Sequence, residues 1–169
     1  MRRLFFLLAT LLLTEIVVAA DLYVDKDSIG GSCSDSNSGT LAQPFCTIHQ
    51  GIEASQPGDT VYIRSGTYNE PAGESCFGGA DCGTLYIDKS GTENNPITFK
   101  GYPGDNMPVI QGNGNTGYAA TPNGQSNIVI DGLELTDGYM GVWFASGHNI
   151  VIRNNVIHGN IVDRGNNNQ

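Results

Sequence analysis

Short runs of alternating apolar residues repeat along the second half of the chain. The sequence Asn-Ile-Val-Ile occurs at Asn127–Ile130 and again, 22 residues later, at Asn149–Ile152. Each copy precedes another apolar run, Leu133–Leu135 or Val156–Ile157, and Val142–Phe144 lies between the copies. A period of two is typical of strands that bury one face. The pattern predicts three short strands in each 22-residue repeat.

A repeat this short cannot bury its own apolar face, so neighbouring repeats must stack. Three strands per repeat, each paired with its equivalents in the adjacent repeats, make a parallel β-solenoid. Similar runs occur earlier at Ile97–Phe99 and Val61–Ile63, where the spacing grows to 31 and 36 residues. We expect the additional residues in two polar loops, 113–125 and 71–83. The sequence therefore predicts an all-β fold of about four coils with three short parallel sheets.

Residue types between the strands predict how each coil turns. Gly101, Gly132 and Asn154 follow equivalent strands, and Gly and Asn adopt left-handed backbone conformations at low cost. We expect a tight corner at each of the three. If the solenoid is right, Ile128 and Ile150 must lie directly on top of each other inside it.

One segment before the coils has helical signals. Thr47 and Gln50 form a capping box, Ile48 and Ile52 share one helical face, and Pro57 ends the pattern. An open solenoid end needs a cover over its stacked apolar residues and strand edges. We therefore predict an N-terminal capping α-helix. No comparable closing segment is evident before Gln169, and we expect the domain, 21–169, to be incomplete at its C-terminal end.

Composition and charge narrow the class of protein. The chain has 23 glycines among 169 residues, which argues against a helical bundle. Its formal net charge of −9 argues against nucleic-acid binding, because neutralising phosphates requires a basic surface. Residues 1–20 read as a secretory signal peptide: Arg2 and Arg3 precede an apolar stretch, and small residues end at Ala20. We therefore expect cleavage after Ala20 and a protein that is secreted, periplasmic or displayed at the cell surface, without a membrane span after cleavage.

Export favours disulfides between the four cysteines. Proximity in sequence favours pairing Cys33 with Cys46 and Cys76 with Cys82. Zinc is the alternative, but no pair has the spacing of two to four residues that zinc sites show. We therefore predict two structural disulfides and no metal site.

Several segments together resemble secreted right-handed parallel β-helix proteins of the pectin-lyase-like superfamily, which includes pectate lyases and the chondroitinase B and alginate lyase group. The resemblance lies in the Asn-Ile-Val-Ile coils and in six earlier segments: Leu22–Asp25, Asp35–Thr40, Gln43–Phe45, Pro57–Ile63, Gly66–Tyr68 and Asn95–Gly104. It is specific for the fold and much less so for the activity, since one scaffold hosts many functions.

The resemblance implies where a ligand binds. In this superfamily the tight corner joins the second strand of a coil to the third, which makes Val142–Phe144 a strand of the first sheet, the usual floor of the sugar-binding cleft. With Val142 and Phe144 directed inward, Trp143 faces out, and Tyr86 occupies the same face earlier in the chain. Aromatic rings suit sugar faces. The alternative for Trp143 is that a loop covers it as part of a small outer core.

Several charged residues are candidates for the base or the cation ligands of a lyase site. β-Elimination needs a base and a cation, and Arg64, Lys100 and Arg153 are the candidate bases. Alternation instead predicts an outward column of Lys100, Asp131 and Arg153 with Arg64 above it, which favours a surface salt ladder. Asp131 with Glu134 and Asp137 could suggest a Ca²⁺ cluster, but their spacing favours solvated carboxylates. Three histidines, His49, His148 and His158, show no catalytic spacing.

Two functions therefore remain open. The first is the N-terminal part of a secreted pectate-lyase-like enzyme that acts on acidic polysaccharide, with an Arg or Lys base and Ca²⁺ supplied by coils beyond residue 169. The second is a noncatalytic surface or carbohydrate-binding β-helix. For either function the candidate substrate-binding residues are Trp143 and Tyr86, and catalytic residues stay unassigned.

Overall fold

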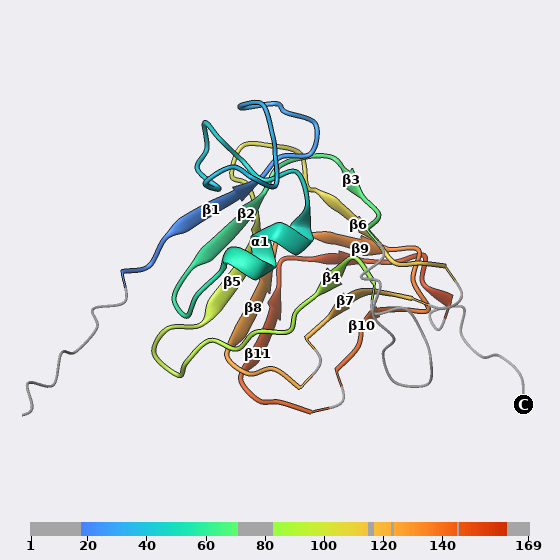
Figure 1. Cartoon of the computed structure of the whole chain (residues 1–169). Helices are drawn as coiled ribbons and strands as arrows, with labels where there is room; N and C mark the ends of the chain where they lie inside the picture. The colour runs from blue at the N-terminus through green and yellow to red at the C-terminus, as the bar shows by residue number, and fades with distance from the viewer. Residues whose placement is uncertain (1–17, 71–82, 115–116, 123, 145, 162–169) are drawn as a thin grey trace, which may run out of the picture.

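Three parallel sheets wind around one core in the computed structural model, which describes residues 18–70, 83–114, 117–122, 124–144 and 146–161 (Figure 1). The five-stranded sheet contains β1 (Asp21–Val24), β2 (Thr60–Ile63), β5 (Ile97–Gly101), β8 (Ile128–Asp131) and β11 (Ile150–Arg153). The four-stranded sheet contains β3 (Thr67–Tyr68), β6 (Val109–Gln111), β9 (Glu134–Thr136) and β12 (Val156–Ile157). The three-stranded sheet contains β4 (Leu85–Tyr86), β7 (Tyr118–Thr121) and β10 (Met140–Val142). The predicted right-handed parallel β-helix is confirmed.

The strands stack in the register that the repeat predicted. Ile128 pairs with Ile97 on one side and with Ile150 on the other. Ile128 and Ile97 are fully buried, whereas Ile150 is only partly buried, because no described coil lies beyond β11. The same position explains why Ile152 and Val156 are exposed. The apolar rungs of the solenoid therefore end in an uncovered face at β11 and β12.

Two of the three predicted left-handed corners are confirmed. Gly132 has a φ of 70° and Asn154 a φ of 55°. Gly101 was wrongly predicted, since it continues β5 without a positive φ. A side chain at Gly101 would collide with the carbonyl oxygen of Gly132 in the next coil, so close packing of coils explains this glycine.

The three-stranded sheet departs from the prediction in two places. Strand β7 lies inside the segment 113–125, which was expected to be only a loop. Strand β10 ends at Val142, and Phe144 is 51% exposed, so the inward position predicted for Phe144 is wrong. Val142 does pack against the core, as predicted.

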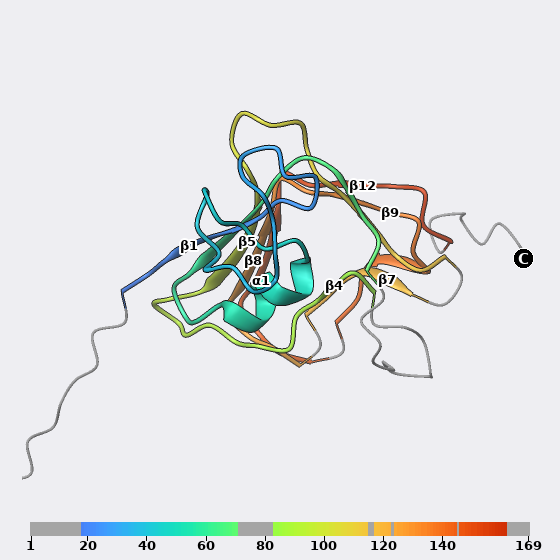
Figure 2. The ribbon, with the colours of Figure 1, turned by 45° about the horizontal axis from the view of Figure 1, so that its top comes forward.

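Helix α1 (Ile48–Ala54) covers the first coil and confirms the predicted N-terminal cap (Figure 2). The Thr47 hydroxyl accepts a hydrogen bond from the Gln50 amide at 3.1 Å, as a capping box requires. The Thr47 amide donates to Asp35 at 3.0 Å, so a carboxylate from the preceding loop takes the place predicted for the Gln50 side chain. Glu70 accepts hydrogen bonds from the next two amides, at 2.8 Å from Ile48. Burial raises the pKa of Glu70 despite these bonds.

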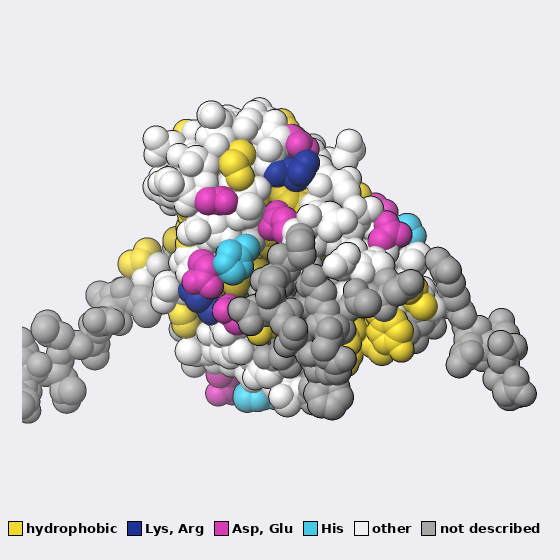
Figure 3. All heavy atoms as spheres, turned by 45° about the vertical axis from the view of Figure 1, so that its right-hand side comes forward, with side chains coloured by type: hydrophobic (Ala, Val, Ile, Leu, Met, Phe, Trp, Pro, Cys, Tyr) yellow, Lys and Arg dark blue, Asp and Glu magenta, His cyan; other side chains and the backbone are white. Residues whose placement is uncertain are grey.

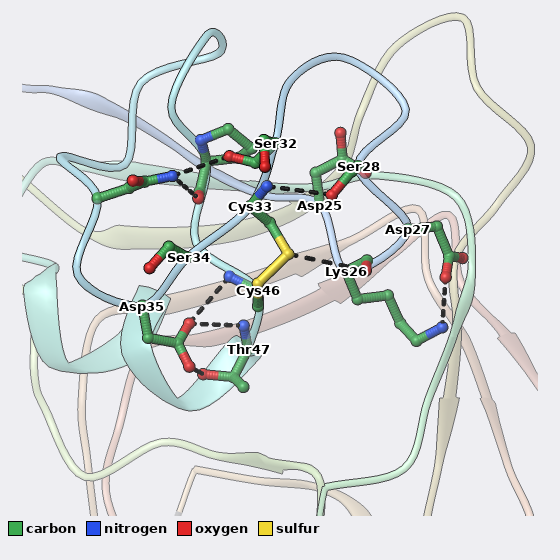
Figure 4. The surroundings of a disulfide bond; sticks show 12 residues. Asp25, Lys26, Asp27, Ser28, Ser32, Cys33, Ser34, Asp35, Cys46 and Thr47 are labelled. Atoms are coloured by element: carbon green, nitrogen blue, oxygen red, sulfur yellow. Dashed lines mark hydrogen bonds and ion pairs between the residues drawn. A yellow bond between two sulfur atoms is a disulfide. The ribbon is translucent and has the colours of Figure 1, made fainter.

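The loop that leads to the helix is closed by the predicted disulfide between Cys33 and Cys46 (Figure 4). Asp35 lies beside this bond and accepts hydrogen bonds from the amides of Cys46 and Thr47. The loop and the start of α1 are thus held by one covalent and several polar contacts. The predicted partners Cys76 and Cys82 lie outside the described residues.

Candidate functional site

Aromatic side chains gather on the three-stranded sheet and its flanking residues. Tyr118 packs against Tyr86, Met140 and Trp143 in a cluster separate from the main core, and Tyr139 lies against Tyr118. We call these five residues the aromatic surface. It lies on the sheet that the resemblance identified as the floor of a cleft.

Strand register explains why the two predicted members share one face. Leu85 pairs with Ala120, and Ala120 with Val142, so these residues form one inward column. The next residues along the strands are Tyr86 and Trp143, and the Trp143 amide donates to the Ala120 carbonyl at 3.0 Å. The side chains of Tyr86 and Trp143 both pack against Tyr118, outside the main core, and both are half-buried. Sugar binding by either residue stays a prediction.

The rings of the aromatic surface are ordered against one another. Tyr118 and Trp143 stack with their centroids 5.2 Å apart and an interplanar angle of 12°, and Tyr139 meets Tyr118 edge-on at 6.4 Å. Tyr118 is only 5% exposed, whereas Tyr139 is 40% exposed. Tyr118 thus supports Trp143 from beneath, while Tyr139 presents a ring to solvent. Such rings combine apolar faces with polar edges, which is the chemistry that pyranose sugars contact.

No residue of β4, β7 or β10 is charged. A base for β-elimination and a cation that neutralises a uronate carboxylate would both need charged side chains here. On the face drawn in Figure 3, Asp and Glu side chains are more numerous than Lys and Arg and lie in separate patches. The residues of β4, β7 and β10 therefore supply neither a base nor a cation ligand for elimination.

The predicted salt ladder exists on the five-stranded sheet. Lys100, Asp131 and Arg153 pair in register, and the Asp131 carboxylate lies 3.7 Å from Lys100 and 3.1 Å from Arg153. Tyr62, not Arg64, lies above Lys100, because Arg64 follows the last residue of β2. The predicted position of Arg64 is therefore wrong.

Arg64 instead closes a buried ion pair. Its Nε lies 2.6 Å from Asp105, and its guanidinium lies over the ring of Tyr102 with a separation of 4.5 Å. The hydrogen bond from Arg64 lowers the pKa of Asp105. A guanidinium that is bound in this way is a structural group and has no proton-accepting role.

The candidate calcium ligands do not converge. Asp131 faces Lys100 and Arg153, Glu134 binds His158 at 2.9 Å, and Asp137 accepts a hydrogen bond from Gln111 at 2.7 Å. Among the described residues no group of three His, Cys, Asp or Glu side chains could hold a metal ion. Asp131, Glu134 and Asp137 therefore do not form a Ca²⁺ site together.

The other two histidines have different surroundings. His148 shares a hydrogen bond of 2.9 Å with the Ser126 hydroxyl, and the His148 amide donates to the same oxygen. Both residues occupy equivalent turns of adjacent coils, and the contact ties those turns together. His49 is exposed on α1.

Sequence reasoning missed three members of the aromatic surface, Tyr118, Tyr139 and Met140. Tyr118 begins a strand that contains no alternating Ile, Val or Phe residues to detect. Tyr139 lies just before β10 in a turn. A usable signal was the spacing of 22 between Tyr118 and Met140, which equals the repeat and matches their pairing.

No helix in the described part of the chain has the length and apolar character needed to cross a membrane.

Comparisons with known proteins agree with this architecture. An uncharacterized protein, YwoF, of Bacillus subtilis (strain 168) is 32% identical over 94% of this chain and 36% of its own length. Pectate lyase PEL9 of Emericella nidulans is 31% identical over 57% of this chain and 19% of its own. A solved rhamnogalacturonan lyase superposes with a TM-score of 0.56 at 27% identity, covering 70% of this chain and 29% of the lyase.

The chain thus spans about a third or less of the length of these relatives. Residues 28–168 match the family described as "Pel9A-like, right handed beta helix region". That match includes every strand except β1 and contains the whole aromatic surface. The chain belongs to the Pel9A-like right-handed β-helix family, within the pectin-lyase-like superfamily.

Proposed function

We propose that this chain is the N-terminal part of a secreted, pectate-lyase-like protein that acts on or binds acidic polysaccharide. The observation that carries the proposal is the aromatic surface on the three-stranded sheet, outside the main core, with Trp143 stacked on Tyr118. In this proposal the aromatic surface binds sugar rings at one end of the cleft. Further coils supply the Arg or Lys base and the carboxylates that hold Ca²⁺.

A noncatalytic binding role is the second candidate function. It is favoured by the uncharged strands β4, β7 and β10 and by the ion pairs that occupy Arg64 and Arg153. A protein with this role would bind the same polymers without cleaving them. The two candidates differ in what coils beyond residue 169 contribute.

Binding can be measured directly, because Trp143 is the only tryptophan. Its fluorescence is recorded while oligogalacturonate, oligoalginate and a neutral oligosaccharide are added in turn, with Ca²⁺ or with a chelator. The proposal expects a saturable change with at least one acidic oligosaccharide. If none of the acidic oligosaccharides binds under either condition, the proposed function is wrong.

The role of the aromatic surface is tested with Trp143→Ala, measured by calorimetry. We expect the affinity to be lower by about two- to twelvefold, because a stacked aromatic contact contributes about 0.5–1.5 kcal/mol. The matched control is Tyr62→Ala, which removes an aromatic ring from the outer face of the five-stranded sheet. Equal losses in both variants would contradict the assignment of this surface.

Elimination is tested on the longer protein and on this chain in parallel. The lyase proposal expects ultraviolet absorbance of unsaturated uronate products from the longer protein only, with loss of the signal in chelator. Binding without any unsaturated product from either protein would favour the noncatalytic role.

A further inference from the structure

A buried carboxylate holds the residue at which the solenoid begins. Asp59 precedes β2 and is only 4% exposed. One of its oxygens accepts a hydrogen bond from the Gln56 amide at 2.8 Å, and the other accepts one from the Ala20 nitrogen at 2.7 Å. The Ala20 carbonyl in turn accepts a hydrogen bond from the Thr60 amide at 2.9 Å. Both backbone polar groups of Ala20 are therefore used by the fold.

The side chain of Ala20 is exposed, as are those of the two residues before it, so Ala20 is distinguished by its backbone hydrogen bonds. Val18 and Ala19 are exposed, and Val18 is an apolar side chain with 78% of its surface in solvent. The sheet contacts thus begin at Ala20, one residue ahead of β1.

The sequence favoured cleavage of the signal peptide after Ala20, but the rules for signal peptidase also allow cleavage after Ala19. Signal peptidases need a small residue immediately before the cut, and both Ala19 and Ala20 satisfy this requirement. A cut after Ala20 would remove the group that binds one oxygen of buried Asp59 and the acceptor of the Thr60 amide. An unpaired buried carboxylate oxygen is costly. A cut after Ala19 leaves every one of these contacts in place.

We propose that the exported protein begins at Ala20 and that Asp59 is the binding site for its new α-ammonium group. Signal peptidase hydrolyses the Ala19–Ala20 peptide bond with one water molecule, which leaves a carboxylate on Ala19 and an ammonium group on the Ala20 nitrogen. That nitrogen already lies 2.7 Å from Asp59, so cleavage converts a neutral amide donor into a charged one. The charged donor adds the Coulomb attraction of an ion pair to a hydrogen bond that is already made to a carboxylate. The inference rests on the export that is part of the proposed function, and it is independent of sugar binding.

The first test is the N-terminus of the protein collected outside a secreting host. N-terminal sequencing and intact mass are expected to give Ala20 as the first residue. A first residue of Asp21, or a retained leader, would overturn the proposal. Sugar binding is measured separately, so loss of one result leaves the other intact.

The second test isolates the charge at Ala20. Two chains that start at Ala20 are prepared, one with a free and one with an acetylated N-terminus. In both chains the Ala20 nitrogen can donate a hydrogen bond to Asp59, but only the free N-terminus is charged. We expect acetylation to raise the unfolding equilibrium constant roughly tenfold, since it replaces an ion pair with Asp59 by a hydrogen bond from a neutral amide. No effect of acetylation would overturn the pairing with Asp59.

The same comparison in Asp59→Asn identifies the partner. The effect of acetylation is expected to disappear in this variant and to persist in Asp88→Asn, which changes an exposed carboxylate. If Asp59→Asn does not fold, nitrogen NMR gives the pKa of the Ala20 α-amino group in the unmodified protein. A value above the ordinary range of about 7.7–8.0 supports the proposal, and an ordinary value contradicts it.

Discussion

At the scale of single residues, outward positions of the five-stranded sheet carry a charged column that stabilises the fold. Asp131 is 5% exposed although it lies on the outer face, because Lys100, Arg153 and Asn154 surround it. Burial opposes ionisation, but the hydrogen bonds from Asn154 and Arg153 outweigh it and lower the pKa of Asp131. The ionised carboxylate is therefore favoured in the folded chain.

Replacing this carboxylate should lower stability in a pH-dependent way. We expect Asp131→Asn to reduce the free energy of unfolding by about 1 kcal/mol at pH 7, since Arg153 is partly screened by solvent. A pKa that is lowered on folding stabilises the protein above the pKa of the unfolded chain, about 3.9, and this stabilisation is lost as the pH falls through the folded value.

Urea unfolding at pH 7 and at pH 3 measures this difference. The gap between wild type and Asp131→Asn should shrink at the lower pH, while Glu93→Gln, an exposed control, should match wild type at both. A gap that is equal at the two pH values would contradict the ionic origin of the effect.

Sequence reasoning found this column but gave wrong side-chain directions for Arg64 and, on the three-stranded sheet, for Phe144. Lys100, Asp131 and Arg153 lie within strands, where alternation fixes the side-chain direction. Arg64 and Phe144 follow the last residues of β2 and β10, where alternation no longer applies. Their directions depend on contacts such as Asp105, which is distant in sequence and gives no local signal.

At the scale of elements, prediction succeeded where Ile, Val or Phe residues alternate along a strand and failed where they do not. Strand β8 was found although all four of its residues are buried, because its sequence alternates and recurs 22 residues later. The alternating strands β2, β5 and β8 were found with nearly correct bounds. Strand β7 is buried at every position, and its composition of Tyr, Ala and Thr is unremarkable for a loop. The aromatic surface was therefore only half predictable, because Tyr118 belongs to this strand.

Helix α1 depends on a close approach to the first coil. A Cβ atom at Gly51 would lie 2.8 Å from Val24 and 3.0 Å from Val61, so only glycine lets the helix pack against these buried side chains. The sequence indicated the helix through its cap but gave no sign of this requirement.

Enlarging Gly51 should displace the cap. We expect Gly51→Val to lower the free energy of unfolding by about 2 kcal/mol, because overpacking a rigid core costs about 1–3 kcal/mol. His49→Val is the matched control, since it places the same β-branched residue at an exposed position of the same helix. Thermal unfolding of the two variants measures the difference, and similar losses in both would point to helix propensity instead.

At the scale of the whole molecule, each coil is stabilised by the coils on either side of it. The repeat was predictable as a whole because its period of 22 residues is copied almost unchanged in the last two coils. Strand β7 was missed because the spacing of 31 residues between Ile97 and Ile128 indicated an insertion, and the segment 113–125 that contains β7 was assigned to it. Two coils of nearly the same sequence can therefore be compared: the coil of β8 has a neighbouring coil on each side, and the coil of β11 has a described neighbour on one side only.

Hydrogen exchange can use that comparison. The two Asn-Ile-Val-Ile segments have the same sequence and hence similar intrinsic exchange, but β8 lies between β5 and β11, whereas no described strand lies beyond β11. We expect the segment at 149–152 to exchange at least about tenfold faster than the segment at 127–130, because stability in stacked repeats comes from neighbours. Mass spectrometry of the corresponding peptides measures both rates. Equal rates would contradict this dependence on neighbouring coils.

The asymmetry between the two ends of the solenoid has a consequence for the 169-residue chain at high concentration. Helix α1 covers one end of the solenoid, whereas the apolar side chains of Ile152, Val156 and Ile157 are exposed at the other end. Exposed strand edges can pair with further chains. A fibril, however, grows only when both ends of each molecule can pair. Self-association through this face should therefore stop at tail-to-tail pairs instead of growing into filaments.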